Sequence, residues 1–103
     1  MFKELILKYS DFCWFEVTDK RLRTTLEDQA DKEIRYGSPL YSIKRKLKAL
    51  AKSGRQDDVL FSDGEKFYVI HLAWNNGTGS GPRFKALAPE DLIGYMEWYY
   101  LNV

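Results

Sequence analysis

The sequence predicts an α+β fold, in which an antiparallel sheet of three to four strands carries helices packed on one face. The first observation is the segment 57–74, where two apolar runs flank Asp63-Gly64. Asp-Gly supplies the positive φ that a tight turn needs, so this segment is predicted to be a β-hairpin. The second observation is the helical spacing of apolar residues in segments on both sides of the hairpin. The 103 residues suit a single domain, 1–103, because a chain of this length can bury about two-thirds of its unfolded surface.

Three segments are predicted to be helices, at about 2–9, 19–36 and 89–101. In the longest of them, apolar residues recur at every fourth position from Leu22 to Ile34. Thr18 or Asp19 is expected to cap its start, and Gly37 is expected to end it. The remaining positions of this helix are almost all polar or charged, so its narrow apolar stripe is expected to lie on the sheet.

Four segments are predicted to be strands, at about 46–52, 57–62, 67–74 and 83–87. Along 67–74 the odd-numbered side chains point to one face of the sheet and the even-numbered ones to the other. Both sets are mostly apolar, which indicates a central strand that is covered at least in part on both sides. The apolar segment 12–17 fits a strand and a helical turn equally well, and the sequence does not decide between them.

The segment 43–52 also fits two structures. Ile43, Leu47 and Leu50 follow a helical stripe, and intrinsic propensity favours a helix. As a strand, Ala49 and Ala51 would lie on one face, with Lys46, Lys48 and Lys52 forming a stripe on the other. We predict a strand over 46–52, because a hairpin without a third partner is only marginally stable.

Composition excludes several classes of protein. The formal net charge is +1, so no strong overall field attracts nucleic acid or a membrane surface. Cys13 is the only cysteine, which rules out an intramolecular disulfide and a metal site with two thiolates. No run approaches the ~18 apolar residues of a membrane span, and the first residues lack a signal-peptide pattern. These features predict a cytoplasmic protein without a membrane partner.

The sequence of the predicted hairpin is similar to that of a known group of proteins. In its Asp-Asp-Val-Leu-Phe segment at 57–61 and its Val-Ile-His-Leu-Ala-Trp segment at 69–74, the chain resembles a group of small bacterial cytosolic proteins. These proteins share an Asp-Asp-Val-Leu-Phe segment, an Asp-Gly turn and a Val-His-Leu-Thr-Trp strand, from which Ala73 departs. The resemblance covers 38–74, and a proline near position 46 in related segments suits a strand there. It implies a fold and a compartment, without an assigned activity.

His71 is the only histidine, and therefore the only general base or metal ligand of that type. We expect a hydrogen-bonded histidine on a partly buried sheet face, because no partner that would position it for catalysis is visible in the sequence. Asp57 and Asp58 are adjacent, so on a strand they face opposite sides, and we expect them to cap a turn or a strand edge. Cys13 has apolar neighbours and is expected to be an inert buried thiol. No metal site and no cofactor are predicted.

Two further groups of residues are candidate binding sites. Between positions 34 and 56 the chain has basic residues but no acidic ones, and the candidates there are Lys44, Arg45, Lys46 and Lys48. They could contact the phosphates of a nucleic acid, but the acidic helix at 19–36 could neutralise them within the fold. The glycine-rich segment 77–81 lacks the spacing of a phosphate-binding loop and is expected to be a connection.

Aromatic residues form the other group, Trp74, Tyr95, Trp98 and Tyr99. One helical stripe cannot bury all the aromatic residues of 89–101, and exposed rings of this kind are enriched at interfaces. The sequence therefore favours a non-catalytic cytosolic binding module, monomeric or homodimeric, whose partner is a protein. By analogy an immunity or antitoxin-like protein would fit. The alternatives are a nucleic-acid-binding protein that uses 44–55 and a small enzyme centred on His71, which a pocket holding His71 with a carboxylate would favour.

Overall fold

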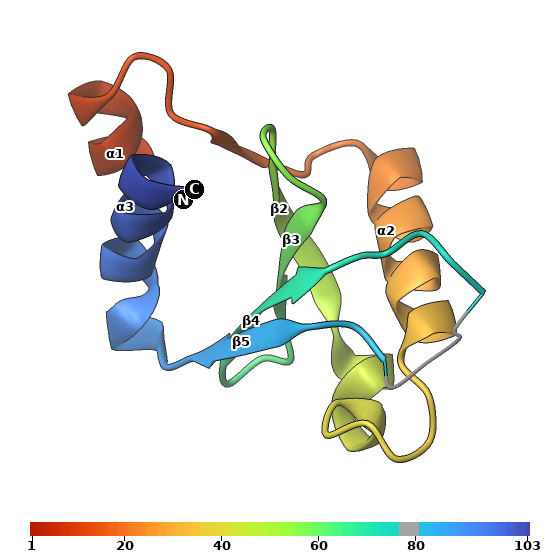
Figure 1. The fold of residues 1–103 in the computed structure, drawn as a ribbon. Helices are drawn as coiled ribbons and strands as arrows, with labels where there is room; N and C mark the ends of the chain where they lie inside the picture. Colours follow the sequence, from red (N-terminus) through yellow and green to blue (C-terminus); the bar gives the residue numbers. More distant parts are fainter. Residues whose placement is uncertain (77–80) are drawn as a thin grey trace.

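The computed structural model describes residues 1–76 and 81–103, in which a central sheet lies between two layers of helices (Figure 1). Helix α1 (Lys3–Lys8) and helix α3 (Leu92–Asn102) lie together on one face of the sheet. Helix α2 (Lys20–Glu33) covers the other face. The predicted connection at 77–81 lies outside the described residues, except for Gly81. No helix in the described ranges is long and apolar enough to cross a membrane.

In the described part of the chain the sheet is antiparallel, with five strands in the order β1-β2-β3-β4-β5. The strands are β1 (Trp14–Glu16), β2 (Lys48–Ser53), β3 (Asp58–Ser62), β4 (Phe67–His71) and β5 (Phe84–Leu87). The predicted α+β class and antiparallel sheet are confirmed, but the predicted number of three to four strands is wrong. The additional strand is β1, which comes from the segment that the sequence left undecided. It is short, and its pairing with the distant β2 fixes it as a strand.

The segment predicted as a strand at 46–52 is a strand, but it begins two residues later than predicted. A 3₁₀ helix, η1 (Tyr41–Lys46), precedes it, and β2 then begins at Lys48. The chain can bury Leu47 at the junction because its backbone is already extended there.

The predicted lysine stripe on β2 is wrong. The pairing of β2 with β3 shifts between Ala49 and Ala51, which is the signature of a β-bulge. After the bulge Lys52 lies opposite Val59, whereas Lys48, before it, lies opposite Ser62. Residues directly opposite each other share a face, so Lys48 and Lys52 are on different sides of the sheet.

The helices lie near their predicted positions, and the differences are at the end of α2 and at the start of α3. Asp19 caps α2 as predicted, with its side chain accepting a hydrogen bond from the backbone N–H of Arg21 at 3.2 Å. The helix ends at Glu33 rather than near 36, because the chain becomes extended at Ile34, whose side chain is buried. The last predicted helix is divided, with a 3₁₀ turn, η2 (Pro89–Asp91), before α3.

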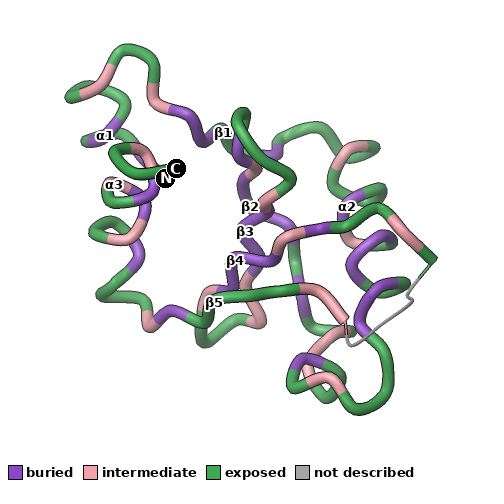
Figure 2. Tube along the Cα trace, in the orientation of Figure 1, coloured by how far each residue is buried: buried purple, intermediate pink, exposed green. Residues whose placement is uncertain are grey.

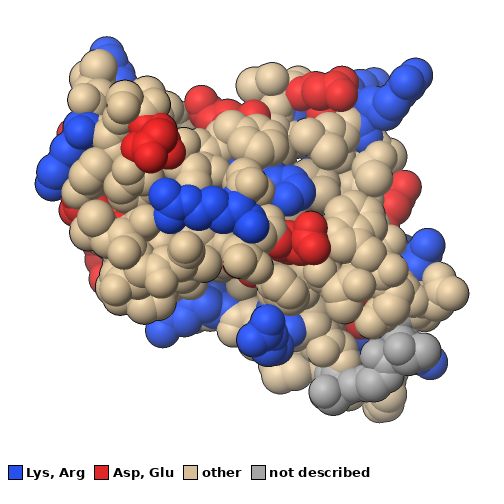
Figure 3. Space-filling view, turned by 45° about the horizontal axis from the view of Figure 1, so that its top comes forward, with Lys and Arg blue, Asp and Glu red and all other residues tan. Residues whose placement is uncertain are grey.

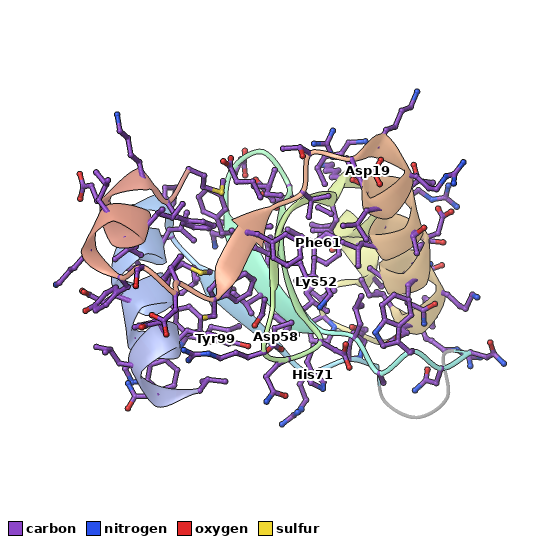
Figure 4. All side chains as sticks on the ribbon, turned by 90° about the horizontal axis from the view of Figure 1, so that it is seen from above. Asp19, Lys52, Asp58, Phe61, His71 and Tyr99 are labelled. Carbon is purple, nitrogen blue, oxygen red and sulfur yellow. The ribbon has the colours of Figure 1, made fainter. Side chains whose placement is uncertain are left out.

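Each face of the sheet has its own hydrophobic core, so the expectation that all helices pack on one face is wrong (Figure 2). Phe61 of β3 points toward α2, while its neighbour Leu60 belongs to the core under α1 and α3 (Figure 4). Because side chains alternate along a strand and both sets are apolar, each set needs a covering layer. Cys13 is in the second core, where burial raises the pKa of its thiol, as expected of an inert cysteine.

Candidate functional site

A pocket of about 310 Å³ lies between helix α3 and the part of the sheet formed by β3, β4 and β5. This volume is at the lower end of the range for small-molecule sites. Its lining comes from four regions of the sequence, and its residues are Gln56, Asp58, Val69, His71, Arg83, Phe84, Lys85, Tyr95, Trp98, Tyr99 and Val103. The pocket therefore exists only once α3 has packed on the sheet.

The hairpin turn determines which residues meet in this pocket. The Asp63 carboxylate accepts the backbone N–H groups of Glu65 and Lys66, both at 2.9 Å, and Gly64 takes a φ of +99°. This turn fixes a register in which Asp58 lies directly opposite His71. Because residues in opposite positions share a face, the carboxylate and the imidazole lie side by side on the α3 side of the sheet (Figure 4).

Asp58 and His71 form a hydrogen-bonded pair. The Asp58 Oδ1 atom lies 2.9 Å from His71 Nδ1, and the two side chains are 15% and 30% exposed. A carboxylate accepts hydrogen bonds, so this contact favours the tautomer with the proton on Nδ1. The other ring nitrogen, Nε2, has no hydrogen-bond partner among the described residues, and the His71 side chain lines the pocket.

Tyr99 anchors this pair from α3. Its hydroxyl donates a hydrogen bond of 2.6 Å to Asp58 Oδ2, so both carboxylate oxygens are engaged. Burial, and then the hydrogen bond to Asp58, raise the pKa of Tyr99, and the phenol therefore stays a donor at neutral pH. The Tyr99 oxygen also lies 3.1 Å from Ser53 Oγ, and Ser53 donates there because the Tyr99 proton is directed at Asp58. These contacts hold the carboxylate in place.

Two cationic side chains stand beside the pair. Lys85 lies opposite Val69, and the backbone N–H of His71 donates to the Arg83 carbonyl at 2.9 Å, so Arg83 and Lys85 flank the α3 side of β4. Both residues are exposed and line the pocket. Within the described ranges, neither has an ion-pair partner. The pocket thus has two cations that the fold itself does not neutralise.

The structure brings together three of the four aromatic candidates. Tyr95, Trp98 and Tyr99 all line the pocket with His71. As expected, the helix does not bury all its rings, since Tyr99 is 2% exposed and Trp98 51%. Trp74 lies apart from the pocket lining, exposed at the end of the segment that follows β4, with its backbone N–H bonded to Glu33.

The expectation that Asp58 caps a turn or a strand edge is wrong, because Asp58 lies opposite His71 on the neighbouring strand. Asp58 does not cap a turn or a strand edge, because its carboxylate is engaged by His71 and Tyr99. His71 is partly buried and hydrogen-bonded, as predicted, but it does have the positioned partner that the sequence did not reveal. Sequence reasoning also missed Arg83 and Lys85.

None of the basic candidates lines the pocket. Lys44 lies 3.5 Å from the Asp31 carboxylate and 4.8 Å from the centre of the Tyr41 ring. Arg45 and Lys46 are exposed on η1, and Lys48 is exposed at the start of β2. Figure 3 shows basic and acidic side chains interspersed on the visible face of the molecule, rather than one continuous basic surface.

Comparisons of the chain with protein-family models, curated proteins and solved structures find no match. We therefore infer the chemistry of the site from its own residues. Among residues 1–76 and 81–103 no group of three or more His, Cys, Asp or Glu side chains is arranged to hold a metal ion. What these residues do form is a histidine that lines a pocket, with one ring nitrogen bonded to a carboxylate and the other without a partner among the described residues, which is an arrangement suited to proton transfer.

Proposed function

We propose that the protein is a small enzyme that uses His71 as a general base and acid on a small molecule bound in the pocket beside α3. One observation carries this proposal, namely that the Asp58–His71 pair lines a pocket that could hold such a molecule. The sequence favoured a non-catalytic module because His71 had no visible partner. Asp58 is such a partner, and its contact with His71 therefore favours an enzyme over a non-catalytic module.

The expected chemistry follows from the two ring nitrogens. With Nδ1–H directed at Asp58, the lone pair on Nε2 can accept a proton from a bound hydroxyl group or from water. The imidazolium that forms would be stabilised by the Asp58 carboxylate, which Tyr99 holds in place. As the activated oxygen bonds to an electrophilic carbon or phosphorus atom of the bound molecule, the same proton can pass from Nε2 to the group whose bond to that atom breaks. Acid–base catalysis of this kind contributes about 10²- to 10⁴-fold to a rate.

A panel of chromogenic substrates tests this function. We expect the wild-type protein to turn over at least one class among 4-nitrophenyl esters, phosphate monoesters, phosphate diesters and glycosides. His71→Gln should lower that rate by about 10²- to 10⁴-fold, because it removes the base. Asp58→Asn should lower it by at least about tenfold, because the amide keeps only one acceptor oxygen, and with that oxygen accepting from Tyr99 its N–H₂ group faces His71 Nδ1 and favours the wrong tautomer.

Lys46→Gln is the matched control, since Lys46 is exposed on η1 and does not line the pocket. Its rate should equal that of the wild type, and circular dichroism should show that all variants are folded. A rate that is the same in His71→Gln and wild type, or no turnover of any class by the wild type, would contradict the proposal.

Binding to a protein partner is the second candidate. Apolar side chains stand exposed on the two neighbouring helices, with Leu7 of α1 77% exposed and Leu101 of α3 62% exposed. Large exposed apolar side chains on neighbouring elements are typical of interaction surfaces. The two candidates differ in the role of His71, because His71→Gln would leave binding through these helices unchanged. Nucleic-acid binding through 44–55 has less support, since the bulge in β2 separates Lys48 from Lys52.

A further inference from the structure

We propose that the ligand of this pocket is a nucleotide-like molecule, a planar ring that carries one phosphate group. The proposal deepens the proposed function by naming its substrate class, and it rests on the same pocket. Its phosphate would lie against Arg83, Lys85 and His71, and its ring against the aromatic side chains of α3.

The charges of the lining point to an anion. Arg83 and Lys85 are the cations of the pocket, and neither is paired within the described part of the chain. Among the described side chains that line the pocket, Asp58 is the only acidic one, and both of its oxygens already accept hydrogen bonds from within the protein. These side chains therefore carry more positive than negative charge, and the positive charge of Arg83 and Lys85 is free to meet a ligand.

The number of donors favours phosphate over carboxylate. A guanidinium presents a fork of N–H groups, and an ammonium presents three. Arg83 lies directly before β5 and Lys85 lies within it, and the backbone N–H of His71 on β4 donates to the Arg83 carbonyl at 2.9 Å. A phosphate monoester has three terminal oxygens to accept from these donors, whereas a carboxylate has two.

The opposite wall of the pocket suits a planar ring. Tyr95 and Trp98 lie next to each other on α3, with ring centres 5.6 Å apart and a tilt of 34°. Trp98 is 51% exposed, so much of its ring is not covered by the protein. Uncovered aromatic faces beside cationic groups are the usual platform for nucleobases, because every base has a face that can stack.

The size of the pocket limits the ligand. A volume of about 310 Å³ suits one ring system with one phosphate group rather than a longer molecule that is fully enclosed. The same chemistry is found in a free nucleoside monophosphate and in a 5′-phosphorylated nucleotide at the end of a single strand. The experiment separates these two sources.

Isothermal titration calorimetry of the full chain tests the proposal with AMP, GMP, CMP and UMP, and with adenosine and inorganic phosphate. We expect at least one monophosphate to bind with a Kd of about 1 mM or tighter. Adenosine and inorganic phosphate should each bind at least about tenfold more weakly, because each makes only half of the contacts. A 5′-phosphorylated tetranucleotide that binds tighter than every monophosphate would identify the end of a strand as the source.

Substitutions in the pocket test which side chains contact the ligand. Arg83→Gln and Lys85→Gln should each weaken binding at least about tenfold through the lost charged contact, and Trp98→Leu should weaken it through the lost stacking surface. Arg45→Gln and Trp74→Leu are the matched controls outside the pocket, and should bind like the wild type. The proposal is overturned if no monophosphate binds at about 5 mM to the folded protein, or if Arg83→Gln and Lys85→Gln both bind like the wild type.

The binding experiment and the activity experiment can have different outcomes, so the ligand class and the enzyme function are tested separately. Binding of a monophosphate without turnover of any chromogenic substrate would support the ligand class and contradict the enzyme. Turnover that depends on His71, without binding of any monophosphate, would support the enzyme and overturn the ligand class.

Discussion

Replacing Leu26 or Ile70 by alanine is expected to lower the free energy of unfolding by about 2–5 kcal/mol in each case. Leu26 belongs to α2 and Ile70 to β4, both are 0% exposed, and both lie in the core between that helix and the sheet. Each change removes apolar contacts and leaves a cavity that the packed neighbours can fill only in part. Denaturation with urea or guanidinium chloride, followed by circular dichroism, measures the loss.

Leu7→Ala is the control for these two changes. Leu7 is 77% exposed on α1, so the same truncation should change the free energy of unfolding by less than about 0.5 kcal/mol. A loss of less than about 0.5 kcal/mol in both Leu26→Ala and Ile70→Ala would contradict the packing of α2 on the sheet.

Glu33→Ala is expected to have an effect of similar size, about 3 kcal/mol or more. Glu33 is only 2% exposed, and its carboxylate ties the end of α2 to the segment after β4. It accepts hydrogen bonds from the backbone N–H groups of Ala73 at 2.8 Å and Trp74 at 2.7 Å, and from Gln29 Nε2 at 2.6 Å. Alanine would leave the two part-buried backbone donors without this acceptor and Gln29 Nε2 with only the Asn75 carbonyl, and each donor left unsatisfied costs up to about 1–3 kcal/mol.

The positive φ of Trp74, +57°, adds to this expectation, because a bulky residue adopts that conformation only when its surroundings hold it there. Glu33→Gln keeps one acceptor oxygen and should lose less stability than Glu33→Ala. Glu90→Ala, at an exposed position of η2, should be close to neutral. Equal stabilities of Glu33→Ala and wild type in the same denaturation experiment would show that the contact is not formed in solution.

Local patterns predicted the elements whose cause is local. The Asp63-Gly64 turn, the alternation along the strand predicted at 67–74 and the cap at Asp19 each depend on a few neighbouring residues, and the structure contains all three, although the strand ends at His71 rather than at Trp74. The strand β1 could not be predicted in this way, because its three residues are extended only through pairing with β2, more than thirty positions away. The second covering layer was already indicated by the apolar character of both faces of β4, which one layer of helices cannot bury.

The residues of the candidate site also include some that local patterns could reveal and others that only the folded chain brings together. The contact of Asp58 with His71 could have been found, because counting outward from the turn at 63–66 places Ser62 opposite Phe67 and then Asp58 opposite His71. The positions of Tyr99 and Trp98 could not, since the rotation of α3 about its axis is set by its packing on the sheet. The same holds for Arg83 and Lys85, which become part of a site only when β5 pairs with β4.

The most direct measurement is ¹⁵N NMR of the imidazole, which is unambiguous because the chain has a single histidine. The spectrum at alkaline pH, where an imidazole is neutral, identifies the nitrogen that carries the proton. If Asp58 holds His71 with Nε2 facing the pocket, the proton is on Nδ1 in the wild type, and this preference is lost in Asp58→Ala. A wild-type spectrum with the proton on Nε2, unchanged in Asp58→Ala, would contradict the orientation on which the proposed function depends.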